Sequence, residues 1–264
     1  MSNQTGDRKA RRVSAADWGV NSQAARGLPC RLFKCFIQCC ANSCKRGCRR
    51  LRSGLAGLLL STLPLPALSG SPGLPASLFS WVQNAYGAEA RDRVEAWSRL
   101  LARAASLPER RQLEAVNDFF NRVPYLSDSQ TWGREDYWAT PVEMLAEDAA
   151  DCEDYAIAKY YTLRQLGVAE DKLRIAYVKA LNLDQAHMVL TYYPTPEAVP
   201  LVLDNLQRRI ERATERTDLK PVYSFNGDGL WLAVSRAEGR RVGDATRIKL
   251  WQNLLTKLGL EMAR

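Results

Sequence analysis

The stretch "DCEDYAIAKYYTLRQLGV", residues 151–168, decides the fold prediction because a cysteine stands where an apolar repeat of helical period begins. The repeat predicts a helix with one buried face, and Gly167 is typical of a helix end. Cys152 would then lie in the first turn, where free backbone N–H groups and the helix dipole stabilise an anion. The sequence therefore offers Cys152 as a thiolate nucleophile, although a buried structural cysteine is the commoner role for a lone thiol.

Charge and cysteine content divide the chain into two regions. The 264 residues carry a formal net charge of +8 and are 46% hydrophobic, which is ample for a globular core. Residues 1–53 hold 12 Lys/Arg against 2 Asp/Glu, which leaves 25 against 27 in residues 54–264. The larger region is slightly acidic, so we expect no nucleic-acid partner. It also contains only Cys152 of the seven cysteines, so it cannot form an internal disulfide.

The boundary between the regions has the order of a secretory signal peptide. Basic residues ending at Arg52 precede the apolar run "GLAGLLLSTLPLPALS" (54–69) and the small-residue stretch "GSPGLPAS" (70–77). The run is too short and too interrupted by proline for a membrane span, which needs about 20 residues. We expect a leader of residues 1–72, cleavage near residues 69–76 and a periplasmic domain of residues 73–264. Because the basic region is unusually long, the true start of the chain is open.

The remaining sequence predicts an α+β fold, since strands follow helices in blocks. The expected helices cover residues 88–105, 107–123 and 245–262, with a short helix capped by Thr140 and its box partner Glu143. The expected strands cover residues 173–180, 185–193 and 199–206, followed by a hairpin over residues 221–234.

One histidine and one strand-end aspartate complete a possible catalytic set. His187 is the only histidine in the chain, and Asp204 ends the next predicted strand. Adjacent strands can place these side chains together, with Cys152 on the other side of the ring. The alternative is a hydrogen-bonded sheet histidine and an aspartate that caps the segment "NLQRRIERA" (205–213).

Several stretches resemble the transglutaminase core, and in particular the bacterial transglutaminase-like cysteine proteinases of the LapG type. They are "VNDFFNRVPY" (116–125), "DYWATPVEML" (136–145), "DCEDYAIAKYYTLRQLGV" (151–168), "LRIAYVKA" (173–180), "AHMVLTYY" (186–193), "PLVLDNL" (200–206) and "DLKPVYSFN" (218–226). The resemblance implies a papain-like core, in which N-terminal helices pack on an antiparallel sheet and the catalytic cysteine begins a helix. It also implies a catalytic triad of Cys152, His187 and Asp204.

The resemblance further implies a biological setting. Such proteins are periplasmic endopeptidases that clip the N-terminal region of a large repeat-rich surface adhesin at small residues and so disperse biofilm. An inner-membrane receptor inhibits them by sequestration when cyclic di-GMP is high. A glutamine acyltransferase with the same triad and a non-catalytic binding module remain the alternatives.

The acidic residues beside Cys152 predict a calcium site. Asp151, Glu153 and Asp154 should oppose ionisation of the thiol, and a bound Ca²⁺ would neutralise them. Family members that resemble this chain are calcium-dependent, which favours Asp151 and Glu153 as ligands, with Asp154 next. The alternative is that these carboxylates only cap the helix.

Two further expectations concern the surroundings of the predicted site. The aromatic residues Trp132, Tyr137 and Trp138 line either a substrate or partner groove or the core, with neither favoured. Ala150 stands where the similar proteins typically have glycine, which would matter if this position needs a positive φ.

Overall fold

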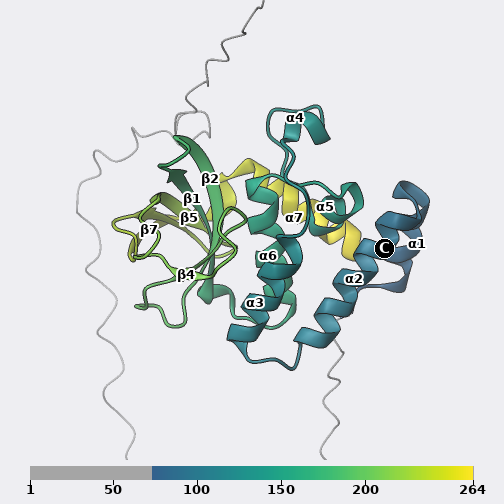
Figure 1. Cartoon of the computed structure of the whole chain (residues 1–264), viewed down its shortest axis with the longest axis horizontal. Helices are drawn as coiled ribbons and strands as arrows, with labels where there is room; N and C mark the ends of the chain where they lie inside the picture. The colour runs from purple at the N-terminus through teal and green to yellow at the C-terminus, as the bar shows by residue number, and fades with distance from the viewer. Residues whose placement is uncertain (1–72, 264) are drawn as a thin grey trace, which may run out of the picture. The chain divides into compact units, whose positions relative to one another are not determined.

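The computed structural model describes residues 73–263, in which helices pack on one face of a single antiparallel sheet (Figure 1). The α-helices are α1 (Ala76–Tyr86), α2 (Ala88–Ala104), α3 (Glu109–Phe120), α4 (Asp128–Thr131), α5 (Pro141–Glu147), α6 (Cys152–Gln165) and α7 (Lys249–Met262), and the 3₁₀ turns are η1 (Glu170–Lys172) and η2 (Ala245–Arg247). The strands are β1 (Leu173–Ala180), β2 (Gln185–Tyr192), β3 (Leu201–Leu203), β4 (Glu211–Arg212), β5 (Leu219–Phe225), β6 (Leu230–Ala233) and β7 (Gly239–Gly243). The predicted α+β class is confirmed.

The sheet has the order β4-β3-β2-β1-β5-β6-β7, and all its neighbouring strands are antiparallel. The predicted pairing of the first three strands is confirmed: β1 pairs with β2, and β2 with β3. Val178 lies opposite His187 in the first pair, and Leu190 lies opposite Leu203 in the second. Asp204 follows Leu203 directly, so the sheet brings the end of β3 close to the start of β2.

Helix α6 begins and ends where the sequence predicts. Its first residue is Cys152, and the carboxylate of Asp154 accepts the backbone N–H of the capping residue Asp151. At the other end, Gly167 adopts φ +89°, and the N–H of Val168 donates to the carbonyl of Leu163. The predicted capping box of α5 is also present, between Thr140 and Glu143.

The core lies between α6 and the sheet. Ala158 and Leu163 of α6 are fully buried against apolar residues that include Leu190 and Phe225. In the same core the indole of Trp97, on α2, donates to the hydroxyl of Thr162 at 2.9 Å. Burial of this face fixes the start of α6 against the sheet.

The structure differs from the elements considered in the sequence analysis in four places. The chain forms three helices rather than two between residues 76 and 120, because α1 precedes the two predicted helices and includes Ala76 and Ser77 of the small-residue stretch. Residues 205–210 form an irregular loop that leads into β4, so Asp204 caps no helix. The last helix starts at Lys249, after η2. Strands β4 and β7 were not expected.

The predicted leader of residues 1–72 lies outside the described residues, so its cleavage stays a prediction. Between residues 73 and 263, none of the helices has both the length and the apolarity that crossing a membrane requires.

Candidate active site

Cys152 opens α6 and lies against β2. Its Sγ donates to Oε2 of Glu153 at 3.0 Å, and the backbone N–H of Met188 also contacts the thiol. Met188 follows His187 in β2, so the helix start and the strand carry the thiol and the imidazole into one region. The predicted position of Cys152 in the first helical turn is confirmed.

His187 and Asp204 form a buried pair. His187 Nε2 lies 2.8 Å from Asp204 Oδ1, and the two residues are 2% and 1% exposed. Hydrogen bonds from His187 and from Arg216, together with the His187 charge, overcome burial, which acts in the opposite direction, and lower the pKa of Asp204 to about 2. The pair therefore contains an ionised carboxylate that fixes one ring nitrogen and leaves Nδ1 for another partner.

Cys152 and His187 line one cleft of about 290 Å³. The other lining residues are Tyr125, Gln185, Ala186, Asn205 and Leu206. Tyr125 is 55% exposed, and its pKa is raised to about 12 by burial of its hydroxyl and by the nearby Cys152 and Asp151. An extended peptide entering this cleft would meet both the thiol and the imidazole.

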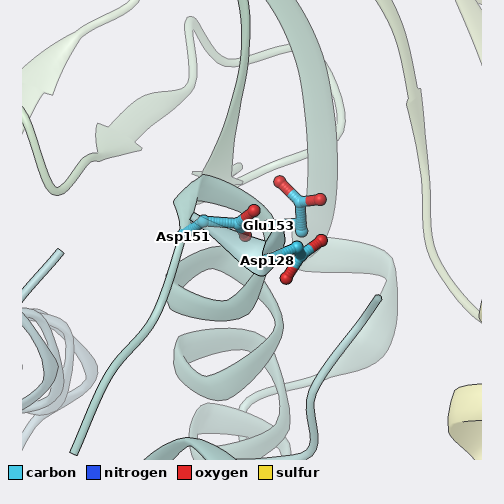
Figure 2. A group of neighbouring side chains, drawn as sticks. All are labelled: Asp128, Asp151 and Glu153. Carbon is cyan, nitrogen blue, oxygen red and sulfur yellow. The ribbon is translucent and has the colours of Figure 1, made fainter. Parts of the chain in front are cut away.

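Three carboxylates gather at the start of α6, where Figure 2 shows Asp128, Asp151 and Glu153 close together. One oxygen from each lies within 4.8 Å of the other two. The pKa is raised to about 9 for Asp151, by burial and by Glu153 and Asp128, and to about 7 for Glu153, mainly by burial. Asp151 Oδ1 is buried and accepts no hydrogen bond. Crowded, buried oxygen ligands of this kind fit a hard divalent cation such as Ca²⁺.

The structure changes the predicted ligand set by one residue. Asp154 lies outside the carboxylate group because Oδ1 accepts the N–H of Ala139 at 2.7 Å and Oδ2 accepts that of Asp151 at 3.3 Å. Asp128 takes its place, although it comes from α4, far from Asp151 in the sequence. Asp154 therefore holds the helix start together, as the capping alternative described.

The carboxylates oppose ionisation of the thiol, as expected. The pKa of Cys152 is raised well above its ordinary value by burial, then by Glu153 and Asp151, and the N–H of Met188 offsets only part of this. Burial and these carboxylates therefore oppose the effect of the helix N-terminus, which favours the thiolate.

None of the three aromatic residues considered for a groove lines the cleft. Trp138 is 3% exposed and stacks on Phe225 with ring centroids 5.7 Å apart, so it belongs to the core. Trp132 and Tyr137 are partly buried and pack together at 4.5 Å, but neither lines the cleft. The exposed aromatic residue beside Cys152 is Tyr125.

Ala150 needs no special backbone conformation. The described non-glycine residues with positive φ are Asp148 and Asp184. Ala150 instead forms a parallel bridge with Tyr125, and its carbonyl accepts the N–H of Leu126 at 2.9 Å. Alanine is therefore tolerated in this position without backbone strain.

A comparison with protein families matches residues 86–237, more than half of the chain, to the bacterial transglutaminase-like cysteine proteinases. The chain belongs to this family. As a bacterial transglutaminase-like cysteine proteinase, it shares its fold with LapG of Legionella pneumophila, at 44% identity and a TM-score of 0.61 over 69% of this chain and 96% of that one.

Two further structures of that protein match the proteinase equally well. One is described as EGTA-treated (45% identity, TM-score 0.61, 69% of this chain and 96% of that one). The other is described as calcium-bound (43% identity, TM-score 0.60, 69% of this chain and 98% of that one). Among curated protein sequences, none matches the chain. Both descriptions concern calcium in the Legionella protein.

Sequence reasoning missed three residues of the site. Asp128 gives no local signal because its partners are distant in the chain, and Tyr125 follows Pro124 in what reads as an ordinary loop. Arg216, which donates to Asp204, lies in a polar turn before β5. The capping pattern of α4 at Ser127 and Gln130 was the one available sign that Asp128 is held in place.

Proposed function

We propose that this proteinase is a periplasmic, calcium-dependent endopeptidase that cleaves the N-terminal region of a large repeat-rich surface adhesin, and so releases the adhesin and disperses biofilm. The observation that carries the proposal is that Cys152 and His187 line one cleft, while the buried Asp204 binds the ring of His187 from behind the cleft lining. The resemblance to the LapG type supports the choice of substrate.

The proposed triad divides the chemistry among three side chains. The Cys152 proton passes to Nδ1 of His187 while Sγ attacks the scissile carbonyl carbon. Asp204 keeps the ring oriented through Nε2 and stabilises the imidazolium. The imidazolium then protonates the leaving amine as the C–N bond breaks, which leaves a thioester on Cys152.

Water completes the cycle. His187 accepts a proton from water, whose oxygen attacks the thioester carbonyl carbon, and Sγ leaves as the C–S bond breaks. The backbone N–H of Cys152, in the first turn of α6, is the proposed oxyanion donor, because N–H groups there lack intrahelical partners.

The carboxylates of Asp128, Asp151 and Glu153 would hold the calcium ion. When bound, calcium would neutralise these carboxylates and so lower the cost of ionising Cys152. The relative's structures described as calcium-bound and EGTA-treated support a role for calcium in this family.

Transfer to an amine is the alternative outcome of the same thioester. Membership of a proteinase family supports transfer to water. Incubation with a glutamine peptide and a labelled amine separates the two: hydrolysis gives new peptide termini, whereas incorporation of the amine without cleavage would indicate an acyltransferase.

Control by an inner-membrane cyclic di-GMP receptor is the last part of the proposal. The exposed Tyr125 and Leu206 flank the cleft, so a receptor side chain placed between them would block substrate entry. This occlusion needs no catalysis. Cys152→Ala should therefore bind the receptor's periplasmic domain like the wild type, and Tyr125→Ala should bind it more weakly. Undiminished binding by Tyr125→Ala together with loss by Cys152→Ala would overturn occlusion.

The direct test of the enzyme activity uses the adhesin's N-terminal fragment in calcium buffer. The wild type should give two products on a gel, and mass spectrometry of the products would locate the cut between small residues. An intact fragment after prolonged incubation would contradict the assignment of substrate.

A further inference from the structure

Arg216 connects Asp204 to a second carboxylate. Its Nη2 donates to Asp204 Oδ2 at 2.7 Å and to Asp218 Oδ2 at 2.7 Å, while its Nε donates to Asp218 Oδ1 at 2.9 Å. Arg216 is 4% exposed, so its charge acts in a largely water-free setting. The guanidinium is therefore fixed by Asp218 and aimed at Asp204.

Both oxygens of Asp204 are thereby committed. Oδ1 accepts His187 Nε2 and the N–H of Leu206, and Oδ2 accepts Arg216. A carboxylate with one such partner could rotate about its χ2 axis or take up a proton when buried. With Arg216 in place, it can do neither without losing the hydrogen bond from the buried guanidinium, which would then be paired by Asp218 alone.

We propose that Arg216, clamped by Asp218, is a positioning residue that holds Asp204 ionised and in the orientation that His187 requires. This rests on the proposed triad and adds a fourth and a fifth residue to it. Arg216 does not touch the cleft, so it acts only through Asp204.

The effect of removing Arg216 on the protonation of Asp204 depends on the titratable and charged groups that face this carboxylate. They are His187 on β2, Lys159 on α6, and Arg216 and Asp218 in the turn before β5. Lys159 is fully buried, and burial lowers its pKa to about 7, so it is a weak substitute for a permanent cation. Removing the guanidinium makes the potential at the His187–Asp204 pair more negative, and both groups should then bind protons more tightly.

Arg236, in the loop between β6 and β7, provides a matched control because its side chain binds the turn that carries Arg216. Its guanidinium donates to the carbonyls of Arg216, Thr217 and Leu219 at 3.2 to 3.4 Å and makes no hydrogen bond to Asp204. Arg236→Gln therefore loosens the turn without removing the charge beside Asp204. A purely structural role for Arg216 predicts that both glutamine variants behave alike.

The test combines kinetics with the titration of His187, whose ring signals in an NMR spectrum belong to the only histidine in the chain. Arg216→Gln should lower kcat by roughly 100-fold with little change in KM, and Arg216→Lys should recover only part of the loss, because a lysine restores a cation but not the two-pronged contact with Asp218. In the Cys152→Ala background, where the thiol of the site is absent, Arg216→Gln should raise the His187 titration midpoint by about one pH unit. Arg236→Gln should leave both readouts near the wild type.

The results for Arg216→Gln and Arg236→Gln decide whether Arg216 is a positioning residue. A folded Arg216→Gln protein with wild-type kcat and an unshifted His187 midpoint overturns the inference, as does an equal shift in Arg236→Gln. If Arg216→Gln does not fold, Asp218→Asn decides: it removes the clamp alone, so kcat should fall several-fold, and an unchanged kcat overturns the inference. Full activity of Asp204→Asn would instead defeat the proposed triad itself.

Discussion

The thiol of Cys152 donates its hydrogen bond to the carboxylate of its neighbour Glu153, with Sγ and Oε2 3.0 Å apart. Burial and the carboxylates of Glu153 and Asp151 raise the pKa of this thiol well above its ordinary value. A cysteine proteinase needs the opposite, a thiol that gives its proton to an imidazole. Neutralising the carboxylates beside Cys152 would lower the cost of ionising the thiol, and this is the role proposed for the calcium site.

Removal of calcium should abolish cleavage. Excess chelator should stop the reaction, and added Ca²⁺ but not Mg²⁺ should restore it, because three crowded carboxylates suit a large cation with irregular coordination. Asp128→Asn and Asp151→Asn should each raise the calcium concentration for half-maximal cleavage by roughly tenfold or more, since each removes one ligand charge. Asp118→Asn, at an exposed carboxylate on α3, is the control. Full activity in chelator, with calcium absent by elemental analysis, would leave these residues as helix caps only.

The calcium-free protein should become less stable as the pH rises. Burial and neighbouring carboxylates raise the pKa of Asp151 to about 9 and burial raises that of Glu153 to about 7, against ordinary values of 3.8 and 4.5. The folded state therefore binds more protons than the unfolded state in this range, and stability is lost from about pH 4 up to about pH 9. At calcium a hundredfold above its Kd, the Tm should rise by about 5 to 10 °C.

Differential scanning calorimetry from pH 5 to pH 8, with chelator and with calcium, measures this dependence. The gap between the two curves should widen with pH, and Asp151→Asn should flatten the chelator curve. Parallel curves for the wild type would show that these carboxylates are not the calcium ligands.

Asp204→Asn should leave the fold intact and lower kcat by on the order of 10³- to 10⁴-fold. An asparagine can still contact His187 but cannot stabilise the imidazolium, and it faces the Arg216 guanidinium without a charge. Circular dichroism should match the wild type at neutral pH. A loss below tenfold would remove Asp204 from the proposed triad.

The variants Trp138→Ala and Tyr125→Ala should distinguish a residue of the core from a residue of the cleft. Trp138 is buried and stacked on Phe225, so its truncation should lower the free energy of unfolding by about 3 to 5 kcal/mol. Tyr125 is largely exposed, so its truncation should change the free energy of unfolding little and raise KM. Urea titrations and steady-state kinetics on both variants check this, and a stable Trp138→Ala protein with a raised KM would reverse the assignment.

The sequence predicted the elements whose signals are local. Strand β1 was expected over residues 173–180 and occurs there, because its apolar and β-branched residues are bounded by turns. Helix α6 carries its own cap and its own terminating glycine. By contrast, β4 has two residues and β7 is rich in arginine, so only pairing with neighbouring strands makes them strands.

The candidate site was predictable where its residues are unique and unpredictable where they depend on tertiary contact. A single histidine in the chain and a single cysteine in residues 54–264 left one choice each. Asp128 and Arg216 are two among many charged residues, and only the folded chain shows that they face Asp151 and Asp204. Packing likewise decides whether Trp138 points into the core or toward solvent, because the sequence of a polar loop does not predict the orientation of its aromatic side chains.

The most direct test of the central claim compares wild-type protein with Cys152→Ser on the adhesin's N-terminal fragment, at saturating calcium and equal protein concentration. A serine hydroxyl differs from the thiol by one atom but ionises far less readily, so folding should be kept while the nucleophile is lost. The account predicts complete cleavage by the wild type and no product above background from Cys152→Ser. Cleavage by Cys152→Ser at the wild-type rate would contradict it.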